Sequence, residues 1–363
     1  MSTTEKTSEM SLDYTRRLQK IEEVLFRTVP WKSDSSWIAR VAGAMRAPTK
    51  PPFVDKINAP NLELLKRGGK RWRPLVLVLI YEMLEGKNLD LAYQLTPLVE
   101  LPHNGSLIVD DIEDRSDERR GGPAIHLMYG VDMAINSGNF LYFLPTYLLD
   151  ELPELGEKEK GVILHYYLEV MRRLHFGQGL DIQWHNDNSF VPEVEDYLQM
   201  CRFKTGSLSR LSAQIGAAAA GASRKICDEQ GALWEDIGVG FQIMDDVKNL
   251  VTGNPGKLRG DDIVEGKKSL PVIYHCQDSA DGGAQLLKLF EGVRSVTGNE
   301  QRTLIEEAIS RIEDTGSLVK AEKRAMELLQ SSQILLKGSH GGHPSGILLN
   351  NLVEGFVRSI RGS

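Results

Sequence analysis

Apolar residues recur along this chain at intervals of three and four, and this periodicity constrains its fold more than any other feature. The stripe Tyr14, Leu18, Ile21 and Leu25 is one example. The alternation of apolar and polar residues that is typical of strands is scarce. Because no fixed-period repeat is visible, the pattern predicts an all-α fold, a single large helical bundle rather than a solenoid. The predicted helices after residue 60 cover 61–67, 74–85, 91–115, 131–150, 158–184, 193–202, 206–222, 225–252, 268–276, 283–294, 300–313, 317–335 and 346–360.

The first 60 residues differ in character from the rest. A first amphipathic helix is followed by a looser segment from Pro30 to Pro60, in which prolines recur and Trp31 and Trp37 suggest exposed positions. We therefore expect residues 1–60 to form an N-terminal helix and a proline-rich arm. Residues 61–363 are expected to form one main domain.

Composition and charge exclude several classes of protein. The 43 basic and 50 acidic residues give a formal charge of -7, which has the wrong sign for a protein that coats nucleic acid. The three cysteines are far apart, so neither a disulfide framework nor a zinc ribbon is indicated. The longest apolar run, Pro74–Tyr81, is too short to be a transmembrane segment. The acidic residues Glu5 and Glu9 also argue against a targeting segment, and we expect a cytoplasmic location.

An acidic cluster follows an apolar helical face at Asp110–Glu118. Asp110 and Asp114 are four residues apart, so on a helix they lie on one face, and Asp111 lies beside them. Two like charges about 4 Å apart cost roughly 4 kcal/mol at an effective dielectric constant near 20, so this face favours a cation. Arginine or a divalent metal could supply the charge. A solvated run, partly neutralised by neighbouring arginines, remains an alternative interpretation.

A second acidic pair supports the metal interpretation. The segment Phe241–Asn249 again places two adjacent aspartates, Asp245 and Asp246, at the end of an apolar helical face. Two helices that present carboxylates to a shared cavity would form an oxygen-rich site for Mg²⁺. Because Mg²⁺ tends to share its coordination with substrate phosphates, the pattern indicates a diphosphate ligand.

Basic residues that could bind such a ligand occur at several positions. The turn from Gly68 to Pro74 contains Lys70, Arg71 and Arg73 and precedes an apolar helix, and a helix start with three cations is a possible anion site. Taken alone, this segment could equally be a solvated basic turn. The other cations near the two acidic pairs are Arg119, Arg120, Lys204, Lys257 and Lys267.

Several of these motifs, in this order, resemble those of the trans-isoprenyl diphosphate synthases, also called the polyprenyl synthetase family. The resemblance covers residues 61–275 most clearly, and it is closest to the eukaryotic-type geranylgeranyl diphosphate synthases. The matching motifs are GGKRWRP from Gly68, HNGSLIVDDIED from His103, Arg119-Arg120-Gly121, GQGLD from Gly177, Lys204-Thr205-Gly206, FQIMDD from Phe241, and Lys257 through Lys267 to Ser269-Leu270-Pro271.

The resemblance implies an all-α fold of the isoprenoid synthase type around a central cavity, isoprenoid diphosphates as substrates and a homodimer. It implies three Mg²⁺ ions, with Asp110, Asp114 and Asp245 as principal ligands and Asp111 and Asp246 in support. The positions that match binding sites for isopentenyl diphosphate are Lys70, Arg73, His103 and Arg120, with Arg71 beside them. Those that match contacts to the allylic diphosphate are Arg119, Lys204, Lys257 and Lys267, with Thr205 and Gln242 beside the reacting carbon.

The resemblance also implies a chemical mechanism and a product length. The metals and cations stabilise the departing pyrophosphate, and the isopentenyl double bond then attacks the allylic cation. In the family, an aromatic residue four or five positions before the first aspartate limits the product to fifteen carbons, whereas here those positions are Gly105 and Ser106. Tyr142, Phe143 and His175 match residues at the floor of the cavity in the geranylgeranyl enzymes. A product of twenty carbons is therefore expected, although ordinary core packing would also explain these three residues.

Alternatives to this function remain open at this point. A farnesyl or longer polyprenyl diphosphate synthase would share all these motifs. A class I terpene cyclase shares the first acidic motif, but Asn249 and Gly253 stand where its second metal motif needs Ser or Thr and then Glu. A non-catalytic synthase subunit usually lacks one aspartate motif, and this chain has both. Two departures from the family pattern are Asn249, where many members have Asp, and Pro102, which could start or kink the helix that carries His103.

Overall fold

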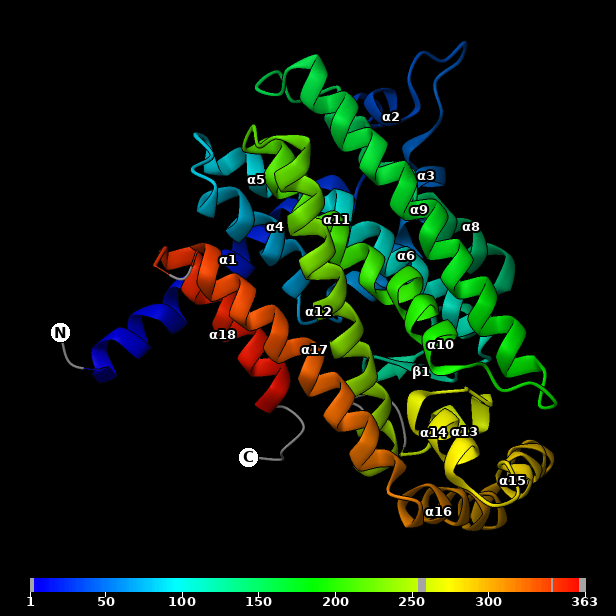
Figure 1. The fold of residues 1–363 in the computed structure, drawn as a ribbon. Helices are drawn as coiled ribbons and strands as arrows, with labels where there is room; N and C mark the ends of the chain where they lie inside the picture. Colours follow the sequence, from blue (N-terminus) through cyan, green and yellow to red (C-terminus); the bar gives the residue numbers. More distant parts are fainter. Residues whose placement is uncertain (1–2, 254–258, 341, 359–363) are drawn as a thin grey trace. The chain divides into compact units, whose positions relative to one another are not determined.

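The computed structural model describes residues 3–253, 259–340 and 342–358 and shows an all-α protein (Figure 1). The α-helices are α1 (Thr3–Thr28), α2 (Ser35–Ala42), α3 (Pro51–Lys66), α4 (Trp72–Met83), α5 (Leu89–Leu95), α6 (Pro97–Glu113), α7 (Ile125–Tyr129), α8 (Val131–Leu141), α9 (Glu157–Asn186), α10 (Val194–Cys201), α11 (Ser207–Ala219), α12 (Arg224–Val251), α13 (Asp261–Glu265), α14 (Leu270–Asp278), α15 (Ala284–Ser295), α16 (Gly298–Asp314), α17 (Ser317–His340) and α18 (Pro344–Arg358). A 3₁₀-helix, η1 (Leu144–Leu149), follows α8, and a π-helix, η2 (Arg202–Gly206), joins α10 to α11.

The chain forms two compact units. The first comprises Met1–Tyr167 and Leu211–Asp228, and the second comprises Leu168–Arg210 and Glu229–Ser363. In the first unit α6 packs against α8, α8 also packs against α3, and α1 packs against α4, α5 and α6. Nearly every residue of α4 is buried, which explains why its sequence is apolar on all sides.

The second unit contains the C-terminal helices. Here α17 packs against both α14 and α18, and α15 packs against α16 (Figure 1). Trp234 of α12 and Phe290 of α15 are among the largest fully buried side chains. Gly240 of α12 lies close to α17, since a Cβ on Gly240 would lie 2.8 Å from Cγ of Leu329.

The all-α prediction is confirmed, with one short exception. Strands β1 (Glu118–Arg119) and β2 (Gly122–Pro123) form an antiparallel hairpin, with Glu118 paired to Pro123 and Arg119 to Gly122. At two residues each, these strands are too short to produce a detectable pattern of alternation. The hairpin begins at Glu118, the last residue of the first acidic cluster, and carries Arg119 and Arg120.

The looser segment expected between Pro30 and Pro60 is largely helical, so this expectation was wrong. Two prolines, Pro51 and Pro52, begin α3 instead of interrupting it, because the fixed φ angle of proline suits the first turn of a helix. The helix expected at 61–67 therefore begins ten residues earlier and contains Pro60.

The α2 helix explains why Trp37 is buried, contrary to expectation. The Asp34 side chain caps α2 by accepting a hydrogen bond from the Trp37 backbone N–H at 2.7 Å. The Trp37 indole is only 4% exposed and donates from Nε1 to the Thr28 carbonyl at 3.2 Å. Trp31, in contrast, is exposed as expected, and its ring stacks on Phe26.

Two predicted helices are divided in the structure. The segment 91–115 contains α5 and α6, which are separated at Thr96, and Pro97 begins α6 in the same way that Pro51 begins α3. Pro102 lies inside α6 and does not start it. The segment 131–150 contains α8 and then the 3₁₀-helix η1.

The three cysteine side chains, Cys201, Cys227 and Cys276, are all buried and form no disulfide. Burial raises the pKa of each thiol, well above its ordinary value for Cys201 and to about 11 for Cys227 and Cys276. Among the described residues, no helix is long and apolar enough to cross a bilayer.

Candidate functional site

Three aspartates at the end of α6 have different surroundings. Asp111 is fully buried, and Arg119 donates two hydrogen bonds to its Oδ1, one from Nε at 2.7 Å and one from Nη2. Arg119 Nη2 also lies 3.4 Å from Oδ2 of Asp110, whose side chain is 15% exposed. Asp114 caps α6, is partly exposed, and donates its backbone N–H to the Asp110 carbonyl at 2.8 Å. Asp111 therefore holds Arg119 in place, while Asp110 and Asp114 are accessible to a ligand.

The β1–β2 hairpin positions the two arginines that follow the acidic cluster. Arg120 lies in its turn with a left-handed φ of 51°. Arg67, the C-cap residue of α3, fixes both strands, because its Nη1 donates to the carbonyls of Arg119 and Pro123, each at 2.9 Å. Arg120 in turn donates from Nη1 to Oδ1 of Asn104 on α6 at 2.9 Å. Burial lowers the pKa of Arg120 to about 10, so its guanidinium is still charged at neutral pH.

The basic turn before α4 lies in the same unit. Lys70 is exposed, whereas Arg73 is 8% exposed and its guanidinium carbon lies 4.4 Å from the centroid of the Trp72 ring. Burial and the positive charges of Arg73 and Arg120 lower the pKa of His103 well below its usual range. The His103 imidazole is therefore neutral at pH 7 and has one N–H to donate to an anionic ligand.

Arg71 was predicted to bind substrate, but its guanidinium is bonded within the protein. Its side chain is 1% exposed and forms ion pairs with Glu22 and Glu100. Although burial opposes the charge, the carboxylates of Glu100 and Glu22 raise the pKa of Arg71 above its ordinary value. Arg71 therefore belongs to the framework behind the turn.

The two small residues expected to leave a pocket open have different contacts. Gly105 faces α8, and a Cβ on it would lie 2.5 Å from the Gly138 carbonyl oxygen and 3.0 Å from Cβ of Leu141. Gly105 thus permits close packing of α6 on α8. Ser106 is partly buried, and its hydroxyl donates to the His103 carbonyl at 2.8 Å.

The three predicted floor residues are placed differently from one another. Tyr142 is 6% exposed, burial raises the pKa of its hydroxyl, and Tyr167 donates to its backbone carbonyl at 2.6 Å. Phe143 is 69% exposed. His175, in the second unit, is also exposed, and its Nδ1 lies 2.8 Å from the Met171 carbonyl oxygen. Tyr142 is the one of the three that this structure buries.

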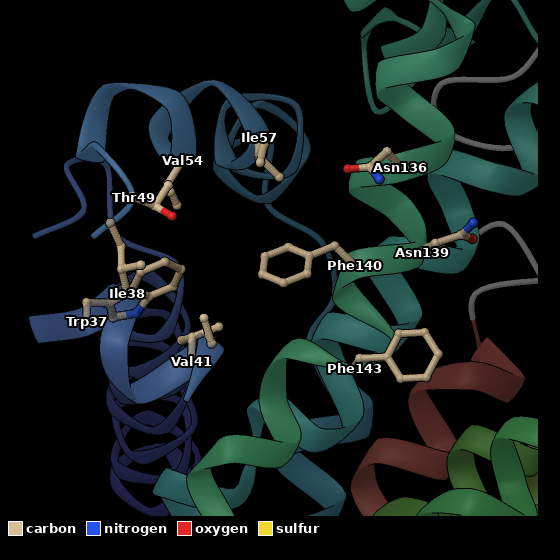
Figure 2. Close-up of a pocket in the computed structure, with 11 residues that line it drawn as sticks. Trp37, Ile38, Val41, Thr49, Val54, Ile57, Asn136, Asn139, Phe140 and Phe143 are labelled. Carbon is tan, nitrogen blue, oxygen red and sulfur yellow. The ribbon is translucent and has the colours of Figure 1, made fainter. Parts of the chain in front are cut away.

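Phe143 also borders a pocket of about 480 Å³ in the first unit (Figure 2). One wall consists of Trp37, Ile38 and Val41 of α2 with Val54 and Ile57 of α3, and the other contains Asn136, Asn139 and Phe140 of α8. None of the predicted ligands of a diphosphate lines this pocket.

In the second unit, the π-helix η2 presents Lys204 and Thr205. A π-helix inserts an extra residue into a helical turn, and such turns are frequent at functional sites. Gly177 of α9 allows the approach, because a Cβ there would lie 2.3 Å from the Lys204 backbone nitrogen. Lys204 Nζ donates to Oδ2 of Asp181 at 2.6 Å. This close packing explains Gly177, the first glycine of the GQGLD segment.

A hydrogen-bond network links Thr205 to the second acidic pair. The Thr205 hydroxyl donates to Oε1 of Gln242 at 2.6 Å, and Gln242 Nε2 donates to Oδ1 of Asp246 at 2.8 Å. The Tyr197 hydroxyl donates to Asp246 Oδ2 at 2.6 Å. Burial raises the pKa of Asp246 to about 6, opposed by these two hydrogen bonds. Asp246 is therefore held by the protein, while its neighbour Asp245 is partly exposed.

The remaining predicted residues of the second unit lie in the last turn of α12 and in the segment after it. Lys267 Nζ forms an ion pair with Glu265 and lies 3.9 Å from Oδ1 of Asp262. Asn249, considered as an oxygen ligand, is 1% exposed, and its Oδ1 accepts from the Asp262 backbone N–H at 3.3 Å. Asn249 thus holds the start of α13. Lys257 lies outside the described residues.

Within each unit, the partly exposed carboxylates supply oxygen donors that fit magnesium ions whose coordination substrate completes. Carboxylate oxygens are the ligands that Mg²⁺ prefers, and Asp110, Asp114 and Asp245 are each partly exposed. Within the described part of the chain, no three His, Cys, Asp or Glu side chains already form a full ligand group. This is expected for Mg²⁺, because the ion usually binds one or two carboxylates and takes its other ligands from waters and substrate phosphates.

Several supporting residues were not predicted from the sequence. Glu100 and Asn104 of α6, Tyr197 of α10 and Asp181 of α9 all bond to a predicted site residue. Asn104 and Asp181 lie in the HNGSLIVDDIED and GQGLD motifs, although no role was predicted for them. Glu100 lies outside these motifs but also has a signal in the sequence, since a lone acid on an otherwise apolar stretch requires a cationic partner when it is buried.

Similarity to known proteins agrees with this geometry. The family model described as polyprenyl synthetase matches residues 54–310. A geranylfarnesyl diphosphate synthase of Aeropyrum pernix is 33% identical over 314 residues, which cover 85% of this chain and 95% of the relative. A geranylgeranyl pyrophosphate synthase of Dictyostelium discoideum is 33% identical over 307 residues, which cover 84% of this chain and 94% of the relative. The crystal structure of a geranylgeranyl pyrophosphate synthetase from Pyrococcus horikoshii has a TM-score of 0.80 at 25% identity, over 97% of this chain and 99% of that one.

The fold, the two acidic pairs and the basic turn define a trans-prenyltransferase. More particularly, the chain belongs to the polyprenyl synthetase family, because the family model matches more than half of its length. It is therefore an enzyme that elongates prenyl chains. The match extends beyond residues 61–275 at both ends and takes in most of α3 and α16.

Proposed function

We propose that this enzyme condenses isopentenyl diphosphate head-to-tail with farnesyl diphosphate, in the presence of Mg²⁺, to give geranylgeranyl diphosphate. The observation that carries the proposal is the division within each acidic pair. One aspartate is buried and hydrogen-bonded by the protein, and its neighbour in the sequence, which faces another direction on the same helix, is partly exposed. A purely structural cluster would not need the accessible carboxylates.

Asp110, Asp114 and Asp245 are the proposed ligands of three Mg²⁺ ions. Asp111 and Asp246 act behind them, the first through Arg119 and the second through Gln242 and Tyr197. When bound, Mg²⁺ neutralises the diphosphate of the allylic substrate and makes pyrophosphate a better leaving group.

Cations on the protein would bind the diphosphate oxygens that remain. Lys70, Arg73 and Arg120, with the neutral imidazole of His103, are proposed for isopentenyl diphosphate, which brings its double bond to the reacting carbon. The residues proposed for the allylic diphosphate are Arg119, Lys204, Lys257 and Lys267. Charge that develops on pyrophosphate as the C–O bond breaks is then stabilised by groups that are already in place.

Thr205 and Gln242 are proposed to face the carbon that loses pyrophosphate. The hydrogen bond between them orients the Gln242 amide, whose NH₂ group is already bonded to Asp246. The electron pair of the isopentenyl double bond forms the new C–C bond. The proton then leaves for pyrophosphate, so no nucleophile on the protein is required.

The proposed product has twenty carbons because the positions four and five residues before Asp110 carry no aromatic ring. The Dictyostelium relative is named a geranylgeranyl pyrophosphate synthase, which supports this length. The Aeropyrum relative is named a geranylfarnesyl diphosphate synthase, so a product of twenty-five carbons is the second candidate. Phe143 and His175 could limit chain growth only if another surface covered them, and we propose that a homodimer does so.

The experiment is a product analysis. Purified enzyme is incubated with labelled isopentenyl diphosphate and dimethylallyl, geranyl or farnesyl diphosphate, with Mg²⁺ or with excess EDTA, and the products are separated by chain length. A twenty-carbon product that depends on Mg²⁺ is expected. Mainly longer products would refute the proposed floor, and turnover in EDTA would refute the role of the metal.

A further inference from the structure

Glu22 on the N-terminal helix bonds directly to the basic turn. Arg71 Nε donates to Oε1 of Glu22 at 2.5 Å, and Arg71 Nη1 donates to Oε1 of Glu100 at 2.6 Å. Nη2 donates to the Leu65 carbonyl at 2.9 Å. All three guanidinium nitrogens of Arg71 are hydrogen-bonded, and its side chain is 1% exposed. Arg71 therefore connects α1, α6 and the end of α3.

The same contacts continue to Arg120. Asn104 Nδ2 donates to Oε1 of Glu100 at 3.0 Å, and Asn104 Oδ1 accepts from Arg120 Nη1 at 2.9 Å. The Arg120 guanidinium also packs on the turn itself, since a Cβ on Gly69 would lie 3.0 Å from its Nη2. One line of bonds therefore runs from Glu22 through Arg71, Glu100 and Asn104 to Arg120.

The backbone of the turn needs this support. Arg71 has a left-handed φ of 46°, which a residue with a side chain adopts only when its surroundings hold it there. Lys70 precedes Arg71 directly, and Arg73 lies in the first turn of the next helix, α4. The bonds that fix the Arg71 side chain thus also fix the directions in which Lys70 and Arg73 leave the backbone.

Charge gives a second reason for the contact. Arg71, Arg73, Arg119 and Arg120 all act on His103 to lower its pKa, so four positive charges lie around one imidazole. Like charges at this density repel one another unless carboxylates offset them. Glu100 and Glu22 supply two such charges on the side of Arg71, Glu22 from a side chain that is 31% exposed.

We propose that Glu22 is a positioning residue for the isopentenyl diphosphate site, acting through Arg71. The N-terminal helix α1 then contributes to the substrate site in addition to packing against α4, α5 and α6. This inference rests on the function proposed above. It makes a separate claim, because the enzyme could catalyse the reaction without any contribution from Glu22.

The test compares Glu22→Gln with Glu23→Gln. Both variants remove one carboxylate charge from adjacent positions of α1, but Glu23 is exposed and bonds only to Gln19 among the described contacts. We expect Glu22→Gln to raise the KM for isopentenyl diphosphate about tenfold, with kcat within about twofold and the KM for the allylic substrate unchanged. Glu23→Gln is expected to match the wild type, and Glu22→Asp to recover part of the loss.

Melting temperatures of all variants are measured in parallel. A merely structural role would lower the melting temperature of Glu22→Gln and leave its KM for isopentenyl diphosphate unchanged, and this result would overturn the inference. An equal rise of KM in Glu23→Gln would also overturn it, because it would show a general effect of charge. Failure of the proposed function would appear earlier and differently, as a wild-type enzyme that forms no prenyl product from these substrates.

Discussion

At the scale of single residues, the predicted site residues divide into partly exposed side chains, which are the proposed ligand contacts, and buried side chains that bond within the protein. Asp110 and Asp111 are adjacent and chemically identical, yet Asp111 is fully buried against Arg119 and Asp110 is partly exposed. A helix turns by about 100° per residue, so neighbours necessarily face different surroundings. Lys70 and Arg71 differ in the same way, one exposed and the other buried between two carboxylates.

This division predicts opposite effects for substitutions of adjacent aspartates. Asp110→Ala should lower turnover more than about a hundredfold and change the free energy of unfolding by less than about 1 kcal/mol, because a partly exposed ligand contributes little to folding. Asp111→Asn should instead lower the free energy of unfolding by about 2 kcal/mol or more, since it removes a buried charge that Arg119 needs.

Steady-state kinetics and denaturant unfolding of the two variants check this prediction. Asp245→Ala serves as the counterpart in the second pair and should behave as Asp110→Ala does, with normal helix content by circular dichroism. Near-normal turnover in Asp110→Ala would remove that residue from the metal site.

The sequence allowed the candidate residues to be chosen but did not assign their contacts. The spacing of Asp110 and Asp114 predicted that both lie on one face, and both are partly exposed at the end of α6. The role of Asn249 could not be predicted, because its partner is the backbone of Asp262, thirteen residues further along the chain. Contacts of this kind depend on loop geometry, which side-chain periodicity does not describe.

At the scale of helices, the packing of α6 on α8 depends on two glycines. Gly105 of α6 and Gly138 of α8 face each other, and a Cβ on either would lie 3.0 Å or less from the carbonyl oxygen of the other. The sequence suggested that Gly105 leaves a pocket open. In the structure the space beside Gly105 is filled by the backbone of α8. A side chain at position 105 would therefore clash with α8 first.

Gly105→Ala should therefore destabilise the protein by about 1–3 kcal/mol, because backbone atoms cannot move aside as a flexible side chain can. Gly161→Ala is the matched control, since that glycine also lies in a helix, α9, but a Cβ on it would meet nothing within 4 Å. The control should be neutral or stabilised by up to about 1 kcal/mol. Urea denaturation of both variants measures the difference, and equal stability of Gly105→Ala and wild type would contradict the packing role.

Helices were predicted best where they are long and uninterrupted, as in α9 (Glu157–Asn186, predicted as 158–184) and α12 (Arg224–Val251, predicted as 225–252). The proline-rich segment was predicted worst, because a proline can either interrupt a helix or begin one. Pro51 and Pro52 begin α3. The outcome depends on the residues after the prolines, and here Leu62, Leu64 and Leu65 continue α3 and are buried. Burial of these leucines in the folded protein therefore decided that the prolines begin a helix and do not interrupt one.

At the scale of the whole molecule, the first unit exposes an apolar surface on α7 and α8. Leu127, Met128, Val131 and Ile135 are 41–56% exposed, and Phe143, which follows α8 in the chain, is 69% exposed. Contiguous exposed apolar residues favour association with another protein surface. They support the proposed homodimer, which would also cover Phe143. The homodimer, the division at residue 60 and a cytoplasmic location stay predictions.

Sedimentation analysis tests the homodimer. Wild-type protein should have twice the 40.5 kDa mass of one chain, and Ile135→Glu should shift it toward monomer, because a charge on an apolar interface is left without a partner. Val319→Glu is the control, as Val319 of α17 is 70% exposed but lies far along the chain from this surface. A wild type that sediments as a single chain would contradict the prediction.

The three buried thiols have a practical consequence. With pKa values raised above their ordinary range, Cys201, Cys227 and Cys276 contain little thiolate at neutral pH, so maleimide reagents should leave the folded wild type unmodified. A cysteine introduced at an exposed position, such as Glu23 next to Glu22, would then be the single labelling point for a fluorophore. Movement of the N-terminal helix during turnover could be monitored in this way without removing any native cysteine.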